Sequence, residues 1–466
     1  MQEIIVIGGG LSGLSTAYLL QQKAKAQNIA ISVKVLEKAE RSGGKIWSRS
    51  EEGFLCEWGP NGFLTNKPQT LELCKQLGVD SKLLASNDNA RKRFVVSDGV
   101  LHKLPHNQVE FLTNSLISWR GKLRIAGEFF VAKKETQSDE TLANFTRRRL
   151  GDEALRKLIG PMASGIFAGD PEQMSLQACF PRINQLEQEY GGLLKAMIFL
   201  MRKHHREQKA GNVVSSPAGP GGVLTSFANG IEELTHALVN AIGAENILTT
   251  MGVDEIKQVN EKWQIITQDK IFIADKVVCA TPAYATAKML HRQDIELSNE
   301  LNKIAYSPLV VACLGYDQKQ IAADLNGFGY LFAQGEDDLV LGSLWDSSIF
   351  ANRAPDGKVL FRSMLGGALH PDVLELSDAQ LQAKLESSLV PLMKIQGKPE
   401  LVQIYRHKKA IPHYRLGHLQ LVNNIMNLSK QHNGLFITGN AYFGVGINDC
   451  VAASDKCAQN ILVSLI

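Results

Sequence analysis

Neither sign of charge is in excess in this sequence of 466 residues, because 50 lysine and arginine residues face 47 aspartate and glutamate residues. A dedicated nucleic-acid-binding protein carries a basic excess on the scale of a domain, so we expect no nucleic-acid partner. The seven cysteines are scattered, without a Cys-x-x-Cys pair and without the cysteine and histidine spacing of a zinc site. We therefore expect reduced cysteines and no bound metal ion.

Long apolar runs are missing as well. The longest uncharged apolar stretches, such as residues 304–316, are shorter than the ~20 residues that cross a bilayer as a helix. No basic segment or cleavage site precedes the first apolar stretch, so the pattern predicts no signal peptide. These absences favour a cytoplasmic location, with a peripheral contact on the cytoplasmic face of the inner membrane left open. Hydrophobic residues make up 44% of the chain, which is enough for a large core.

The strongest motif lies near the N-terminus, where the pattern predicts a strand at 3–7, a helix at 14–22 and a second strand at 31–36. A Gly-x-Gly-x-x-Gly turn between a strand and a helix lets a pyrophosphate approach the backbone and the helix N-terminus. An acid at the end of the second strand accepts hydrogen bonds from ribose hydroxyls. The residues predicted to bind a dinucleotide in this way are Gly8, Gly9, Gly10, Leu11, Ser12, Gly13 and Glu37.

Two further turns favour FAD over NAD. Glu-x-x-x-Arg-x-Gly-Gly, which begins with the ribose acid Glu37, is the known extension of the FAD fingerprint, because the extended FAD molecule needs more backbone contacts. A Gly-Pro-Asn-Gly turn in an aromatic setting is predicted to follow an edge of the flavin ring, with a plain turn as the alternative. The residues predicted to bind FAD here are Lys38, Arg41, Gly44 and Lys45 in the first segment and Gly59, Pro60, Asn61 and Gly62 in the second.

The C-terminus repeats the opening pattern, with a strand at 435–438, a glycine-rich loop at 439–446 and a helix at 448–465. A second helix N-terminus would then reach the ribityl side of the flavin. The residues expected there are Val445, Gly446 and Ile447.

Helical periods dominate residues 107–210, with helices predicted at 116–133, 138–150, 153–167 and 186–208. The apolar stretch 193–201 is followed by cations, which suits either a helix lying on anionic lipid or a core helix with a solvated end. The Gly- and Pro-rich segment 215–222 is the best domain boundary in the chain, and a helix is predicted after it at 223–241.

Together these segments predict an α/β protein. A Rossmann-like FAD-binding domain is expected at 1–85, 215–285 and 410–466, an α+β substrate domain at 86–106 and 286–409, and a helical domain at 107–214 that could associate with a membrane.

The whole chain resembles the protoporphyrinogen oxidase family of FAD enzymes, which includes coproporphyrinogen III oxidases and lies within the amine-oxidase group. Besides the FAD motifs, the stretches that carry the resemblance are Ser-Gly-Ile-Phe-Ala-Gly-Asp-Pro at 164–171, Gly-Phe-Gly-Tyr-Leu at 327–331, Asn-Arg-Ala-Pro at 352–355, Met-Leu-Gly-Gly at 364–367 and Gly-Asn-Ala-Tyr at 439–442.

The resemblance implies the six-electron oxidation of a porphyrinogen in heme biosynthesis, with three O2 reduced to three H2O2. It implies non-covalent FAD, with the Val253 backbone at the adenine side. Arg93 would pair with a substrate propionate, although on composition alone residues 91–93 could be a solvated charge run. Gly169, Leu331 and Met364 would line the tetrapyrrole site. No catalytic acid or base is assigned.

Several alternatives stay open. The substrate is expected to be protoporphyrinogen IX, with coproporphyrinogen III as the alternative. Another flavin amine oxidase or a carotenoid desaturase would share every FAD motif, and a flavin-binding protein without turnover belongs to a different class. A hand-off of the product to a chelatase, contact with an anionic membrane and the choice between monomer and homodimer are also open.

Overall fold

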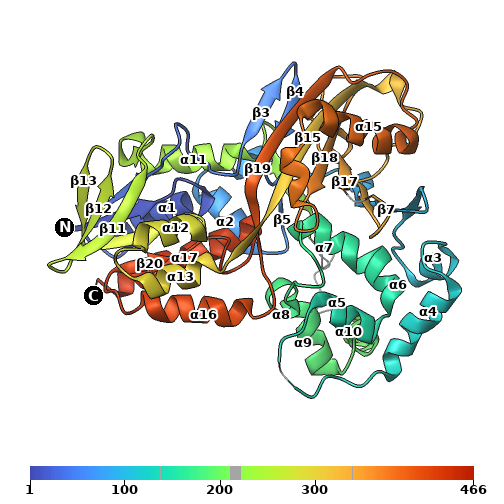
Figure 1. Ribbon diagram of the computed structural model, residues 1–466, viewed down its shortest axis with the longest axis horizontal. Helices are drawn as coiled ribbons and strands as arrows, with labels where there is room; N and C mark the ends of the chain where they lie inside the picture. The colour runs from blue at the N-terminus through green and yellow to red at the C-terminus, as the bar shows by residue number, and fades with distance from the viewer. Residues whose placement is uncertain (137, 210–221, 338, 466) are drawn as a thin grey trace.

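The computed structural model describes residues 1–136, 138–209, 222–337 and 339–465. Most of the segment 215–222, and with it the predicted domain boundary, lies outside the described residues. Figure 1 shows three regions, which are a sheet with helices on both faces near the two termini, a larger sheet, and a group of helices from the middle of the chain. No helix in the described ranges is both long and apolar enough to cross a bilayer.

The first sheet has five strands, all of them parallel. Its central strand is buried on both faces from Ile4 to Ile7, as expected of a parallel strand between two helical layers. This sheet confirms the predicted α/β class. The strand order is β10 (Ile247–Leu248), β2 (Ile31–Leu36), β1 (Gln2–Ile7), β14 (Lys276–Cys279) and β20 (Leu435–Ile437).

Alternate side chains of β1 point into two separate hydrophobic clusters. Ile4 and Val6 pack against helices α1 (Leu11–Ala26), α2 (Pro68–Gln76), α11 (Glu232–Ile242) and α17 (Ile447–Val463). Ile5 and Ile7 pack against helices α12 (Ala283–Leu290), α13 (Ile295–Asn302) and α16 (His418–Ser429) and against the antiparallel strands β11 (Val253–Val259), β12 (Lys262–Thr267) and β13 (Ile271–Ala274).

The second sheet has seven strands, most of them antiparallel. Helix α15 (Asp378–Met393) covers one face through Leu381, Leu385 and Leu389, which leaves the opposite face to meet the first region. The strand order is β19 (Leu401–His413), β15 (Ala305–Asp317), β18 (Lys358–Gly366), β17 (Val340–Trp345), β16 (Gly329–Phe332), β7 (Arg93–Ser97) and β8 (Val100–Lys103).

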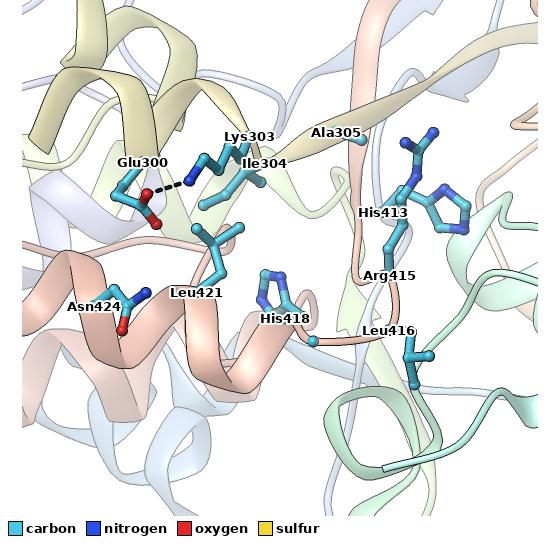
Figure 2. A pocket seen from close by; sticks show the side chains of 11 residues that line it. Glu300, Lys303, Ile304, Ala305, His413, Arg415, Leu416, His418, Leu421 and Asn424 are labelled. Atoms are coloured by element: carbon cyan, nitrogen blue, oxygen red, sulfur yellow. Dashed lines mark hydrogen bonds and ion pairs between the residues drawn. The ribbon is translucent and has the colours of Figure 1, made fainter. Parts of the chain in front are cut away.

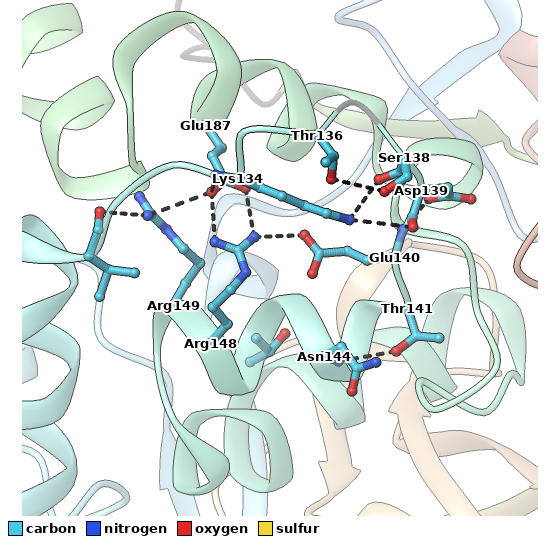
Figure 3. Close-up of polar contacts among 12 residues, drawn as sticks. Lys134, Thr136, Ser138, Asp139, Glu140, Thr141, Asn144, Arg148, Arg149 and Glu187 are labelled. Atoms are coloured by element: carbon cyan, nitrogen blue, oxygen red, sulfur yellow. Dashed lines mark hydrogen bonds and ion pairs between the residues drawn. The ribbon is translucent and has the colours of Figure 1, made fainter.

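The third region is helical, and ion pairs that are buried or partly buried connect its helices. Arg148 and Arg149 on one helix both approach Glu187 on another, at 2.8 and 3.6 Å, and Arg148 also pairs with Glu140 (Figure 3). Its helices are α3 (Gln108–Thr113), α4 (Trp119–Ala126), α5 (Leu142–Arg149), α6 (Asp152–Ala154), α7 (Gly160–Phe167), α8 (Leu176–Cys179), α9 (Pro181–Tyr190) and α10 (Leu193–Lys209).

Two predicted helices are wrong in part. The single helix expected at 186–208 is divided into α9 and α10, because Gly191 adopts φ +76° and ends α9. The helix expected at 223–241 is instead strand β9 (Leu224–Phe227) followed by α11. Strand β9 pairs with β5 (Phe63–Leu64) and β6 (Leu83–Ala85), partners that are remote in the sequence, so its conformation depends on tertiary contacts.

Six of the seven cysteines are buried, and Cys179 is half-buried. Burial raises the pKa of the thiols of Cys74, Cys179, Cys279 and Cys457 to about 12. No group of three His, Cys, Asp or Glu side chains within the described ranges has the arrangement of a metal site.

Candidate active site

The glycine turn after β1 is packed too closely for side chains. A Cβ on Gly13 would lie 1.9 Å from the carbonyl oxygen of Gly8, and Gly8 itself adopts φ +107°. Helix α1 begins at Leu11 with Gly10 as its N-cap and no side chain over its first turn. The backbone N–H groups of this turn are therefore left for a ligand, which is the arrangement that binds a pyrophosphate.

Glu37 stands at the end of β2, beside this turn. Its carboxylate accepts hydrogen bonds from the backbone N–H of Gly9 (2.7 Å) and of Ala39 (2.9 Å). Each carboxylate oxygen retains a further lone pair, so the group can still accept from the two ribose hydroxyls. Val253 begins β11 close by, since the N–H of Met251 donates to the carbonyl oxygen of Glu37 (2.8 Å).

The second glycine pair lies directly against the first turn. The N–H of Gly43 donates to the carbonyl oxygen of Gly9 (2.7 Å), and a Cβ on Gly44 would be 3.0 Å from the Cα of Gly10. Arg41 points into its own loop, where it pairs with Glu232 (2.9 Å) and donates to the Gly44 carbonyl oxygen (2.7 Å). Arg41 thus shapes the loop, while Lys38 is exposed beside it.

Lys45 is half-buried, although its neighbour Gly44 is exposed. Its ammonium group donates to the carbonyl oxygen of Ala410 on β19, and burial lowers the pKa of Lys45 to about 8. A Cβ on Gly59 would lie 2.0 Å from the carbonyl oxygen of Lys45. The two glycine-rich turns predicted from the sequence are therefore in contact with each other.

The Gly59–Gly62 turn is also fixed from two other sides. Arg362 of β18 donates through Nη1 to the carbonyl oxygen of Gly59 (2.8 Å). A Cβ on Gly62 would be 2.5 Å from the carbonyl oxygen of Thr225, so β9 blocks movement on that side. Pro60 is exposed and Asn61 is buried.

The C-terminal helix brings a second N-terminus to this region. Helix α17 begins at Ile447 with Gly446 as N-cap, and it packs along α1. The hydroxyl of Ser454 donates to the carbonyl oxygen of Ser12 (2.9 Å), which fixes the two helices together. Val445, just before the cap, contacts the helical region near Phe167.

These residues fit FAD. They supply a glycine turn with free N–H groups at the start of a helix, an acid with spare lone pairs for a ribose, and two more turns in backbone contact with the first. When FAD is bound, it supplies the redox chemistry of the site, and the protein binds and orients it.

The residues expected to line the substrate site lie on the face of the second sheet opposite α15, part of which packs against β4 and Trp58. Leu331 is paired with Gly342, Gly342 with Met364, and Met364 with Val311 in four adjacent strands. Paired residues of adjacent strands point to the same face, so Leu331, Met364 and Val311 form an apolar row in which Gly342 adds no side chain and Val311 is buried. Tyr405 of β19 extends the row beyond Val311.

Arg93 lies at the edge of this face, on the strand next to Leu331. Its guanidinium group is exposed and stands over the ring of Phe328, 5.2 Å from the ring centre. Within the described ranges, no carboxylate lies within ion-pair distance of Arg93, whereas its neighbour Arg91 pairs with Asp88 (3.1 Å). Arg93 is therefore available to an anionic ligand.

The fourth predicted residue, Gly169, comes from the helical region. The preceding residue, Ala168, adopts φ +46° and accepts a hydrogen bond from the N–H of Ala368 (2.8 Å), just beyond β18. A Cβ on Gly169 would be 2.6 Å from the sulfur of Met174. Helix α7 therefore ends against the sheet face that carries Met364, and the fold brings the four residues to one side of the sheet.

An open pocket of about 350 Å³ adjoins this region (Figure 2). The Glu300–Lys303 ion pair lies on one side of the pocket and His413 with Arg415 on the other. Nε2 of His413 accepts from the N–H of Asp170 (3.3 Å), so the imidazole separates the pocket from the Gly169 segment. His418 also lines the pocket, and burial lowers its pKa to about 4.

The sequence did not single out Val311, Gly342, Tyr405 or Arg362. These residues lie on strands without a local motif, and their place in the row depends on the register of strands far apart in the chain. Alternation of buried and exposed residues would not have identified Val311 on β15 or Arg362 on β18 either, because both strands are buried almost throughout.

The fold and the site define an FAD-binding protein with an apolar ligand face next to the cofactor turns. The model of the family "Flavin containing amine oxidoreductase" matches residues 11–462. The chain belongs to this family and is an FAD-dependent oxidoreductase.

Curated relatives match over the full length. The chain is 27% identical to the coproporphyrinogen III oxidase of Bacillus subtilis, over 100% of this chain and 98% of that protein. It is 28% identical to protoporphyrinogen oxidase 1, chloroplastic, of Arabidopsis thaliana, over 98% of this chain and 88% of that protein. A solved structure from Exiguobacterium sp. 255-15, provisionally assigned as a protoporphyrinogen oxidase, shares the fold with a TM-score of 0.84 at 24% identity and covers 100% of this chain and 99% of its own.

Proposed function

We propose that the protein is an oxygen-dependent porphyrinogen oxidase of heme biosynthesis. It would oxidise protoporphyrinogen IX to protoporphyrin IX in three two-electron steps, each of which reduces one O2 to H2O2. The observation that carries this proposal is the pair of half-buried apolar side chains Leu331 and Met364 on one face of the sheet, with Arg93, which has no ion-pair partner among the described residues, at its edge. A flat macrocycle with carboxylate side groups requires such a wall and such a cation.

The number of available cations favours protoporphyrinogen IX, which has two propionates, over coproporphyrinogen III, which has four. Of the three consecutive cations 91–93, Arg91 is engaged by Asp88. Lys92 precedes the first residue of β7 and alternates with Arg93, so it points away from the apolar row. Coproporphyrinogen III is the second candidate substrate, because the relative from Bacillus subtilis is named a coproporphyrinogen III oxidase.

Porphyrin fluorescence during aerobic turnover tests the proposal. Purified protein loaded with FAD is given protoporphyrinogen IX and coproporphyrinogen III in parallel, and kcat/KM is measured for each. A preference for protoporphyrinogen IX is expected. A preference for coproporphyrinogen III would replace it with the second candidate. No fluorescence with either substrate, although FAD is bound, would contradict the proposal and favour an amine oxidase or a desaturase.

We further propose that the helical region binds the surface of an anionic membrane. Large apolar side chains are exposed on consecutive elements there, with 67% of Trp119, 71% of Leu123 and 85% of Phe130 accessible to solvent. Lys195 of α10 stands over the ring of Phe129, so α10 adjoins this surface. The exposed residues that follow along α10 are Met197, Ile198, Phe199, Met201, Arg202, Lys203 and Arg206. Apolar side chains next to cations are typical of interfacial helices.

A further inference from the structure

Four charged side chains are buried together where the FAD-binding region meets the second sheet. Glu57, Asp346 and Arg353 are inaccessible to solvent, and Arg362 is 4% exposed. Arg353 approaches Glu57 to 3.5 Å, and Nε of Arg362 approaches Asp346 to 3.2 Å. Two acids and two bases leave the cluster with no net charge. Burying charges costs free energy even when they are paired, so the cluster calls for an explanation other than stability.

The Glu57–Arg353 pair is anchored to the FAD-binding region. Glu57 accepts from the hydroxyl of Ser48 (2.6 Å) and from the N–H of Ile231 (2.9 Å). Arg353 donates to the hydroxyl of Ser226 (3.0 Å) on β9. These contacts fix the end of strand β4 (Phe54–Glu57), from which the Gly59–Gly62 turn begins.

The Arg362–Asp346 pair contacts the Gly59–Gly62 turn from the second sheet. The guanidinium group of Arg362 uses Nη1 for the carbonyl oxygens of Gly59 (2.8 Å) and Glu57 (3.3 Å), while its Nε faces Asp346. Burial raises the pKa of Asp346, and the neighbouring guanidinium groups of Arg362 and Arg353 oppose that rise. Asp346 is therefore the buried counter-charge beside Nε of the guanidinium group whose Nη1 holds the turn, an ion pair without hydrogen-bond geometry.

Arg362 also has a fixed relation to the ligand face. It lies two residues before Met364 on β18, so both side chains point to the same side of the sheet. One side chain thus connects the strand that carries Met364 to the turn expected beside the flavin. A displacement of Arg362 would change the spacing between the turn and the apolar row.

We propose that Arg362, oriented by Asp346, is a positioning residue that fixes the Gly59–Gly62 turn against β18 and so sets the distance between the cofactor and the bound porphyrinogen. This inference rests on the proposed function. Neither residue need touch the substrate, because the effect passes through the backbone of the turn.

The test uses FAD-loaded full-length variants Arg362→Lys, Arg362→Met, Asp346→Asn and the double variant Asp346→Asn with Arg362→Met. Lysine keeps the positive charge but has a single nitrogen. It cannot both donate to the carbonyl oxygen of Gly59 and face Asp346, as two separate nitrogens of arginine do. Two quantities are measured, kcat/KM with the better porphyrinogen and the visible absorption spectrum of the bound flavin. Glu128→Gln is the matched control, since it breaks another fully buried ion pair, with Arg149, in the helical region.

We expect Arg362→Lys and Asp346→Asn each to lower kcat/KM between about 10-fold and 100-fold, as a misplacement of about 1 Å does. Both should alter the flavin spectrum, and the double variant should be no worse than Arg362→Met alone. Glu128→Gln should lower the melting temperature and leave kcat/KM and the spectrum as in the wild type.

Three results would overturn the proposal. Wild-type kcat/KM and spectrum in Arg362→Lys would mean that charge alone suffices. Shifts of the flavin absorption in opposite directions in Asp346→Asn and Arg362→Met would indicate that the two residues act on the flavin through their charge rather than through the position of the turn. Additive losses in the double variant would mean that the two residues act independently. If Asp346→Asn does not fold, kcat/KM and the flavin spectrum of Arg362→Lys test the proposal without it. A wild-type protein without activity on porphyrinogens would refute the proposed function, while the flavin spectra would still report on the turn.

Discussion

Glu128 and Arg149 form an ion pair of 2.5 Å in which neither side chain is accessible to solvent. The same carboxylate accepts hydrogen bonds from the N–H groups of Leu193 (2.8 Å) and Leu194 (3.0 Å) at the start of α10. Arg149 in turn donates to the carbonyl oxygens of Val131 and Gly191. One acid therefore accepts from the N-terminus of α10 and also neutralises the buried Arg149 guanidinium group.

Glu128→Gln should lower the free energy of unfolding by about 3 kcal/mol, because it removes the nearer counter-charge of the buried Arg149 guanidinium and leaves only the Glu187 carboxylate, 3.6 Å away. Urea unfolding of the two proteins measures this. The exposed pair Arg49–Glu51 supplies the control, and Glu51→Gln should change stability by less than about 1 kcal/mol. Equal stability of Glu128→Gln and the wild type would contradict the role of the pair.

Glu37→Ala should weaken FAD binding, because the carboxylate is the acceptor for the ribose hydroxyls in the predicted site. Loss of one charge-assisted hydrogen bond corresponds to about 1.5–3 kcal/mol, or at least about tenfold in Kd. Fluorescence titration of the apoprotein with FAD gives the constant. Glu40→Ala, an exposed acid in the same loop, should bind FAD as the wild type does. Unchanged binding by Glu37→Ala would remove Glu37 from the site.

Arg93→Ala should raise KM for the porphyrinogen and leave kcat nearly unchanged. The lost pairing with a carboxylate corresponds to about 1.5–3 kcal/mol, or roughly 10-fold to 150-fold in KM. Steady-state fluorescence assays measure both constants. Arg91→Ala is the control, because Arg91 already pairs with Asp88. If the two variants had the same KM, Arg93 would not contact the substrate.

Acid should destabilise the protein through His418. Its pKa is about 4 in the folded protein and 6.5 ordinarily, so between these values the unfolded chain binds the proton more tightly. Stability must then fall as the pH falls through this window, by about 2–3 kcal/mol between pH 7 and pH 4.5. His407 and His413, whose pKa values burial also lowers, add to the fall.

The variant His418→Gln isolates this contribution. Unfolding in urea at pH 7 and at pH 4.5 should show a smaller loss of stability in the variant than in the wild type. Parallel losses in the two proteins would mean that His418 is not the group that titrates.

Phe130→Glu should reduce sedimentation with anionic liposomes by 10-fold or more, since burial of a phenylalanine side chain is worth about 1.5–3 kcal/mol. Ile271→Glu, which changes an equally hydrophobic side chain that is 59% exposed on β13, should sediment as the wild type does. The assay is run at low salt, where attraction between cations and anionic lipid is strongest. A wild-type protein that stays in the supernatant there would refute the membrane proposal.

The sequence predicted the part of the site that depends on local geometry. The Gly8–Gly13 turn and Glu37 lie within 30 residues of each other, and their spacing between strand and helix is sufficient to identify a nucleotide site. The helix predicted at 14–22 runs from Leu11 to Ala26 in the structure, which accounts for much of the chain between the glycine turn and Glu37.

The rest of the site depends on pairings that no local pattern encodes. Arg362 reaches the carbonyl oxygen of Gly59 across 303 positions of the chain. Strand β9 lies where the sequence predicts a helix, because its four residues form a strand by pairing with the remote strands β5 and β6. The position of Met364 beside Leu331 likewise follows from strand register through Gly342, which a one-residue shift would abolish.

The deep placement of the cysteines has a consequence for the lifetime of the protein. A reaction that releases hydrogen peroxide at every step exposes the catalyst to its own oxidant, and peroxide attacks the thiolate rather than the thiol. With the pKa of Cys450 at about 11 and those of Cys279 and Cys457 at about 12, only a minute share of these sulfurs is ionised at neutral pH. Under the proposed function, these buried thiols would therefore react slowly with the hydrogen peroxide that turnover releases.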